Sequence, residues 1–181
     1  MSVTLNTVSI ENLALPKGSP GDKGASITVG ASVLYSYTTD TGTAANTTET
    51  DLATYTNIPG TTNALTADGD EMVAKGVLTF AANGNTKNVR IKFGGTTAFT
   101  LTSTASGTVV FVEARIVRTS ATAQKIYFTT TVTGVVTTVG KTTSAINLVA
   151  NQIVKITGEN GTATANDIVL NNFTVYSFKS V

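Results

Sequence analysis

The chain of 181 residues contains no cysteine, no histidine and no tryptophan. Without cysteine there is no disulfide framework and no thiolate metal site. Without histidine the sequence lacks the commonest general base, the commonest zinc ligand and any Ser-His-Asp arrangement. Charged residues make up only 13% of the chain, and the net charge of +1 gives no electrostatic basis for binding nucleic acid. These absences favour a protein that is not an enzyme, holds no cofactor or metal, and has no nucleic-acid partner.

Long hydrophobic runs are missing too. The first twelve residues lack the basic start and the apolar run of a signal peptide, and no other run reaches the length that spans a membrane. We therefore expect synthesis in a cytoplasm, no export by the usual signal route and no membrane partner. No window shows a sustained helical period, which argues against an α-helical fold.

Threonine is what the sequence has in abundance, at about a fifth of the residues, and Val, Ile, Phe and Tyr supply most of the apolar content. β-branched and aromatic residues favour strands. The clearest alternation lies in Lys87–Phe93, where Val89, Ile91 and Phe93 alternate with polar residues and give one buried face and one wet face. The pair Gly94-Gly95 then predicts a hairpin turn into a returning strand.

Further strands are predicted along the rest of the chain. The returning strand contains Phe99 and Leu101, and the others are residues 71–80, 109–118, 124–133, 146–157 and 168–178, with additional strands within 27–55. The start of 109–118 is apolar on both faces, which is typical of a central strand, and Asn171-Asn172 predicts a bulge. Turn residues separate the strands: Asp68-Gly69, Asn83-Gly84, Ser106-Gly107, Gly140 and Asn160-Gly161. The pattern predicts an all-β fold, an antiparallel, jelly-roll-like β-sandwich.

Two short zones precede these strands. Residues 1–17 carry scattered apolar side chains that are too few to form a core, so we expect them to dock on a partner: Val3, Leu5, Val8, Ile10, Leu13 and Leu15. Residues 18–26 are three Gly-x-y triplets with Gly18, Gly21 and Gly24, and only glycine fits at the axis of a collagen triple helix. A flexible linker is the alternative. The predicted domains are an anchoring arm (1–17), a collagen-like neck (18–26) and a β-sandwich head (27–181).

Five segments between Thr47 and the C-terminus carry a resemblance to a known family: residues 48–52 (TETDL), 76–83 (ending FAAN), 90–96 (RIKFGGT), 113–119 (EARIVRT) and 165–169 (ANDIV). They resemble a β-sandwich module of bacteriophage virion surface proteins, of the fibre-head and capsid-decoration type. The resemblance implies a homotrimer whose heads follow a fibrous or collagen-like neck, and it implies no catalytic residues. The stretch before Thr47 is much shorter than a fibre shaft, which favours a capsid decoration or head-fibre protein over a tail fibre.

Charge is distributed unevenly along the sequence. Acidic residues dominate residues 40–71, and Lys and Arg dominate residues 75–141. Two interpretations are open: the charges pair between subunits of a trimer or face anionic glycans or a capsid, or they only keep strand faces solvated. Asp68, Asp70 and Glu71 could bind Ca²⁺, although an Asp-Gly turn explains them equally well.

Tyrosines give a further open choice. Tyr35, Tyr37, Tyr55 and Tyr127 can present a binding surface, but core or interface packing is the commoner use of tyrosine in strands.

The first functional hypothesis is a non-enzymatic structural protein on the surface of a bacteriophage virion, made in the cytoplasm of the host bacterium. It would be a homotrimeric capsid decoration or head-fibre protein whose arm binds the capsid or another virion protein. The alternative is a tail-fibre tip that recognises a host surface glycan through loops such as Thr96-Thr97 or residues 139–143. A glycan-degrading enzyme would instead depend on Asp68, Asp70 or Glu113.

Overall fold

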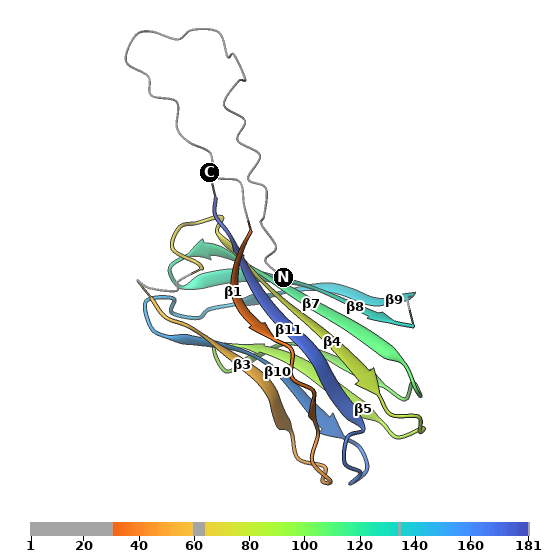
Figure 1. The fold of residues 1–181 in the computed structure, drawn as a ribbon. Helices are drawn as coiled ribbons and strands as arrows, with labels where there is room; N and C mark the ends of the chain where they lie inside the picture. Colours follow the sequence, from red (N-terminus) through yellow and green to blue (C-terminus); the bar gives the residue numbers. More distant parts are fainter. Residues whose placement is uncertain (1–30, 60–63, 134, 181) are drawn as a thin grey trace, which may run out of the picture.

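The computed structural model describes residues 31–59, 64–133 and 135–180, and these residues form eleven β-strands and no helix. The strands make two antiparallel sheets that enclose one hydrophobic core (Figure 1). Since the described part of the chain contains no helix, it offers none that could cross a membrane. The predicted arm and neck lie outside the described residues and stay predictions.

The larger sheet has seven strands, with the order β1-β11-β4-β7-β8-β9 and with β2 pairing to β11. Its strands, in chain order, are β1 (Ser32–Tyr37), β2 (Thr41–Gly42), β4 (Glu71–Phe80), β7 (Val109–Ser120), β8 (Ala123–Val132), β9 (Val135–Ser144) and β11 (Ile168–Phe178).

The smaller sheet has four strands in the order β3-β10-β5-β6. They are β3 (Thr50–Asn57), β5 (Lys87–Phe93), β6 (Thr96–Ser103) and β10 (Gln152–Asn160). The chain passes repeatedly from one sheet to the other, for example from β4 to β5 and from β6 to β7. This connectivity makes the described part of the chain an all-β sandwich, as the sequence predicts.

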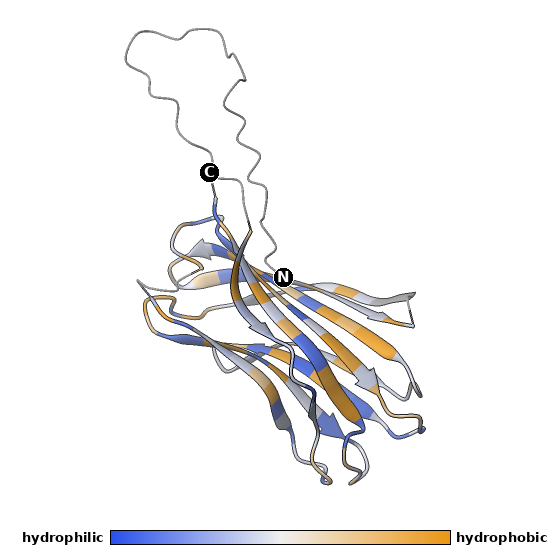
Figure 2. Ribbon diagram, in the orientation of Figure 1, coloured by the Kyte–Doolittle hydropathy of each residue, from blue (hydrophilic) through white to orange (hydrophobic). Residues whose placement is uncertain are grey.

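Alternation along the strands decides which side chains fill the space between the sheets. Met72, Leu78 and Phe80 of β4 are completely buried, and so are Ile91 and Phe93 of β5. The alternation is visible as bands of hydrophobic and hydrophilic residues along the ribbon (Figure 2). Burying one such side chain stabilises the fold by roughly 1.5–3 kcal/mol, so the core accounts for the pairing of two sheets that each leave one face in water.

Several predicted strands are confirmed. The bounds of β4, β5 and β11 are those that the alternation predicts. The register of β11 against β4 shifts between Leu170 and Asn172, which confirms the predicted bulge. Gly94 and Gly95 have φ angles of 55° and 82° and form the β5–β6 hairpin turn, as expected of residues without a Cβ.

Two predictions about the C-terminal half are wrong. Gly140 is no turn residue but lies within β9, a strand that the sequence pattern does not reveal. A Cβ on Gly140 would lie 2.3 Å from Cζ of Phe128, so glycine is needed there because a phenylalanine ring occupies the space. The strand expected at 146–157 begins only at Gln152 and continues to Asn160.

The sandwich has two distinct ends. Ser32, at the start of β1, pairs with Ser177, near the end of β11, so the described chain begins and finishes at one end, here called the proximal end. The antiparallel pairings place residues 38–49, 81–86, 104–108 and 161–167 at the opposite end, here called the distal end. In Figure 1 the proximal end is at the top.

A buried lysine holds the distal end together. Lys87 is inaccessible to solvent, and its ammonium group donates hydrogen bonds to the backbone carbonyls of Asn83 (3.1 Å), Asn85 (3.0 Å) and Ala105 (3.4 Å). It also donates to Oδ1 of Asn83 at 2.9 Å and lies 5.8 Å from the centroid of the Phe80 ring. A buried charge needs such partners to offset its desolvation, so Lys87 cross-links two distal loops.

A carboxylate has the matching role at the proximal end. The Asp70 side chain accepts hydrogen bonds from the backbone amides of Thr66, Ala67 and Ser180 and from the side chain of Lys179. Burial alone would raise the pKa of the Asp70 carboxyl, but these hydrogen bonds outweigh it and hold the pKa well below its ordinary value. The carboxylate therefore fastens the C-terminal end of β11 to the loop before β4.

Candidate functional site

The outer face of the larger sheet is the part of the sandwich that presents a hollowed, partly apolar surface. Outward-pointing residues of β4, β7 and β8 line up across the sheet, because the register pairs Val77 with Phe111 and Phe111 with Thr131. The next row pairs Thr79 with Val109. We call Val77, Thr79, Val109, Phe111 and Thr131 the distal patch.

The distal patch leaves large apolar side chains exposed to solvent on a sheet face. Phe111 keeps 50% of its surface exposed and Val109 keeps 46%. Of the other phenylalanines, Phe80, Phe93 and Phe173 are fully buried. Figure 2 shows the distal half of β7 as a hydrophobic stretch at the lower right of the view. An apolar patch that is contiguous over neighbouring strands is typical of an interaction surface.

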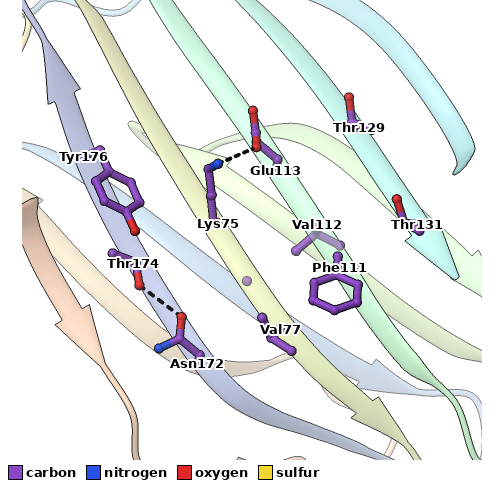
Figure 3. Close-up of a pocket in the computed structure, with 11 residues that line it drawn as sticks. Lys75, Val77, Phe111, Val112, Glu113, Thr129, Thr131, Asn172, Thr174 and Tyr176 are labelled. Carbon is purple, nitrogen blue, oxygen red and sulfur yellow. Dashed lines mark hydrogen bonds and ion pairs between the residues drawn. The ribbon is translucent and has the colours of Figure 1, made fainter. Parts of the chain in front are cut away.

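A hollow of about 380 Å³ lies beside this patch on the same face. Phe111 and Tyr176 stand on opposite sides of it, and a Lys75–Glu113 ion pair of 3.1 Å lies between them (Figure 3). The ammonium group of Lys75 is 5.9 Å from the centroid of the Tyr176 ring. Thr129, on β8, adds a hydroxyl group to the lining. The hollow thus offers aromatic, hydroxyl and charged groups together.

Towards the proximal end the same face becomes charged. Tyr127 of β8 is 42% exposed and pairs across the sheet with Arg115 of β7 and Lys141 of β9. Lys125 lies two residues earlier on β8 and therefore on the same face. We call Arg115, Lys125, Tyr127 and Lys141 the proximal patch. Arg115 forms an ion pair of 3.3 Å with Glu71.

A second hollow adjoins the proximal patch. It is lined by side chains of β4, β7 and β8, namely Glu71, Glu113, Arg115, Val117, Tyr127 and Thr129, and has a volume of about 510 Å³. Glu113 and Thr129 line both hollows. The two hollows therefore adjoin along β7 and β8, and the surface changes from apolar to charged between them.

The outer face of the smaller sheet differs in that its charges neutralise one another. Glu49 lies 2.6 Å from the ammonium group of Lys92 and 3.6 Å from Arg90, and Arg90 also pairs with Glu159. Lys155 pairs with Asp51 at 2.8 Å. Partial burial would raise the pKa of Glu49, but the contacts with Lys92 and its other neighbours lower it below its ordinary value.

The acidic and basic stretches of the sequence thus meet within one chain. Besides the small-sheet network, Asp68 pairs with Arg118 and Glu71 pairs with Arg115. Asp68, Asp70 and Glu71, considered above as calcium ligands, each bind a different partner. In the described part of the chain no group of three or more acidic residues is placed to hold a metal ion.

The tyrosines separate into two sets. The rings of Tyr35 and Tyr37 are stacked 6.3 Å apart, and Tyr35 also lies 5.9 Å from Tyr55, so these three pack against the core. Tyr127 remains exposed. The segments considered as recognition loops, Thr96-Thr97 and residues 139–143, lie in strands β6 and β9, so they are not loops.

The sequence predictions did not include the two hollows or the buried Lys87. The signal for Lys87 was present, since it falls on the same alternating face as Val89 and Ile91. The signal for the distal patch was the apolar start of β7, which was interpreted only as central burial. The predicted arm residues from Val3 to Leu15 and the neck glycines Gly18, Gly21 and Gly24 lie outside the described residues.

Comparison with known proteins places the chain in no family: no family model and no curated protein matches it. Among solved structures, it is similar to a sugar-binding protein described as the EclA C-terminal domain, with a TM-score of 0.43 and 9% identity over 91% of this chain and 84% of the other. It is also similar to peanut lectin in complex with a nine-residue peptide, with a TM-score of 0.39 and 7% identity over 84% of this chain and 99% of the other. The two stacked sheets themselves define the class of the protein, an all-β sandwich.

Proposed function

We propose that this chain is a non-enzymatic structural protein of a bacteriophage virion, a homotrimeric capsid decoration or head-fibre protein. Its sandwich is the head, and residues 1–26 serve as the anchoring arm and neck. The observation that carries the proposal is the distal patch, where Phe111 and Val109 lie half exposed on a central strand. The virion setting comes from the resemblance of residues 47–181 to phage head modules.

A second copy of the chain is the occupant that best suits the distal patch. The patch lies on the central strands β4, β7 and β8, so it offers side chains, and no free backbone edge, to a partner. Its border carries both signs of charge, Lys75 and Glu113 at 3.1 Å. In a threefold ring, three copies of this face meet about one axis, so a charged group of one copy can approach its opposite on the next copy. Phe111 and Val109 then leave water near that axis.

The two ends of the sandwich give the head an orientation. The arm and neck precede β1, which starts at the proximal end. The distal loops, cross-linked through Lys87, then point away from the attachment point.

Two measurements on the full chain test the proposal. We expect light scattering at micromolar concentration to give a mass three times the 18.6 kDa of one chain. We also expect antibody label on the capsid of intact particles in electron microscopy. A variant lacking residues 1–17 should remain trimeric and fail to attach to particles. A monomer, or label confined to the tail tip, would contradict the assignment.

Recognition of a host saccharide is a second candidate function. It is favoured by the hollow in Figure 3, where Phe111 and Tyr176 offer aromatic surface and Thr129 offers a hydroxyl group. Aromatic rings beside hydroxyl and amide groups are the surface that a sugar ring and its hydroxyls complement. Label at the tail tip together with saccharide binding by the isolated chain would favour this function over a shell protein.

A further inference from the structure

The proximal patch concentrates the free positive charge of the protein around one aromatic ring. Of the ten Lys and Arg residues in the described ranges, seven form ion pairs with carboxylates and Lys87 is enclosed by oxygen atoms. The remaining two, Lys125 and Lys141, have no carboxylate within 4.0 Å among the described residues and both lie next to Tyr127.

This arrangement is unfavourable for an isolated head. Lys125, Lys141 and Arg115 surround Tyr127 on one sheet face, and only Arg115 has a carboxylate partner, Glu71. Like charges on neighbouring strands repel each other. In a chain with only 13% charged residues, an anionic partner gives a physical reason to keep these cations together.

We propose that the proximal patch and its hollow bind an acidic saccharide, one that bears carboxylate groups. Its carboxylate pairs with Lys125 and Lys141, and the apolar side of its ring lies against the exposed ring of Tyr127. The proposal rests on the second candidate function, saccharide recognition, and places it in the adjoining hollow beside Tyr127 with a stated class of ligand.

The other side of the hollow separates an acidic saccharide from other anions. Glu71 and Glu113 line the hollow from β4 and β7, and Thr129 adds a hydroxyl group, whereas the two lysines lie outside the lining on β8 and β9. Carboxylates accept hydrogen bonds from sugar hydroxyls, whereas they repel the closely spaced phosphates of a nucleic acid. A ligand that combines hydroxyl groups with a single carboxylate on each ring therefore complements both sides.

The test is calorimetric titration of the full chain with two probes, tetragalacturonate and a sialic-acid tetramer, at low and high salt. The matched control ligand is tetragalacturonate whose carboxylates are methyl-esterified, which keeps the rings and removes the charge. We expect at least one acidic probe to bind, the ester to bind about tenfold more weakly, and added salt to weaken binding.

Variants locate the site. The double variant Lys125→Gln/Lys141→Gln should weaken binding of the acidic probe about tenfold, and Tyr127→Ser should weaken it as well. The control Lys155→Gln removes a lysine from the other sheet face, where it pairs with Asp51, and should leave binding unchanged. Circular dichroism of each variant verifies that it folds.

Two results would overturn the inference in distinguishable ways. If neutral and acidic probes bind equally and the double variant binds like the parent, saccharide recognition survives but the acidic site is wrong. If none of the probes binds, the acidic site is wrong, and the second candidate function then depends on the hollow of Figure 3 alone. Neither result affects the trimer mass, which tests the structural proposal separately.

Discussion

The two outer faces of the sandwich come from similar alternating, threonine-rich strands, but they carry different surface groups. On the smaller sheet, Glu49 contacts Arg90 and Lys92, and Asp51 pairs with Lys155. On the larger sheet, Phe111 and Val109 lie half exposed and the charges towards the proximal end are mostly positive. The smaller sheet exposes one large apolar side chain of its described strands, Ile153, among paired charges, whereas the larger sheet exposes a row of apolar groups and unpaired lysines that a partner can cover.

The difference shows how to separate solvation from function on a sheet surface. A wet strand face needs polar groups, and ion pairs between neighbouring strands supply them without attracting a partner. Surface ion pairs contribute only about 0–1 kcal/mol each, so the smaller sheet's network keeps its face soluble more than it holds the fold together. Exposed apolar side chains and uncompensated lysines on the larger sheet have no such explanation.

The largest stability effect should therefore come from neither face but from the buried charge at the distal end. Lys87→Met should lower the free energy of unfolding by about 2–4 kcal/mol, because the carbonyls of Asn83, Asn85 and Ala105 lose a buried donor. The measurement is urea unfolding followed by circular dichroism.

The matched control for this variant is Lys155→Met, which removes an ion-paired lysine from the outer face of the smaller sheet. It should cost no more than about 1 kcal/mol. Equal losses of unfolding free energy for Lys87→Met and Lys155→Met would show that a surface ion pair stabilises the fold as much as the buried lysine does, which would contradict this account.

A smaller effect is expected on the charged face itself. Glu49→Gln should lower the free energy of unfolding by about 0.5–1.5 kcal/mol at pH 7, because the contacts with Lys92 and Arg90 lose their charge. The pKa of Glu49 is lowered in the fold, so its stabilising contribution is complete above the unfolded value of about 4.3 and is lost as the pH falls below it.

Measuring the free energy of unfolding of the parent chain and of Glu49→Gln as a function of pH tests the direction of this pKa shift. The difference in unfolding free energy between the parent chain and Glu49→Gln should narrow as the pH is lowered from 7 to 3. A difference that stays constant or widens towards acid would mean that the Glu49 carboxylate is not stabilised by its cationic neighbours.

Alternation predicted the strands whose two faces have different environments. In β4 and β5 every second side chain meets the core, and in β11 the same holds on each side of the bulge, so the sequence shows a period of two residues. Strand β9 could not be predicted in this way, because it is rich in threonine and contains Gly140, whose missing side chain makes room for the ring of Phe128. The need for glycine at position 140 comes from Phe128 on the neighbouring strand β8, so the residues next to Gly140 in the sequence do not indicate it.

The candidate site was only partly predictable for a related reason. The apolar start of β7 was visible, but whether Val109 and Phe111 meet a second layer depends on what covers that face of the sheet. The proximal patch brings together Arg115, Lys125 and Lys141 from three strands. Its members are basic residues in the sequence, and only the pairing of β7, β8 and β9 places them around Tyr127.

The most direct test of the central claim, that the outer face of the larger sheet is the assembly face, is the mass in solution of two charge variants. Phe111→Asp places a carboxylate in the distal patch, and Thr100→Asp places one at an exposed position on the outer face of the smaller sheet. We expect light scattering to give a trimer for the parent chain and Thr100→Asp and a folded monomer for Phe111→Asp. A Phe111→Asp variant that remains trimeric, or a parent chain that is monomeric, would contradict the account.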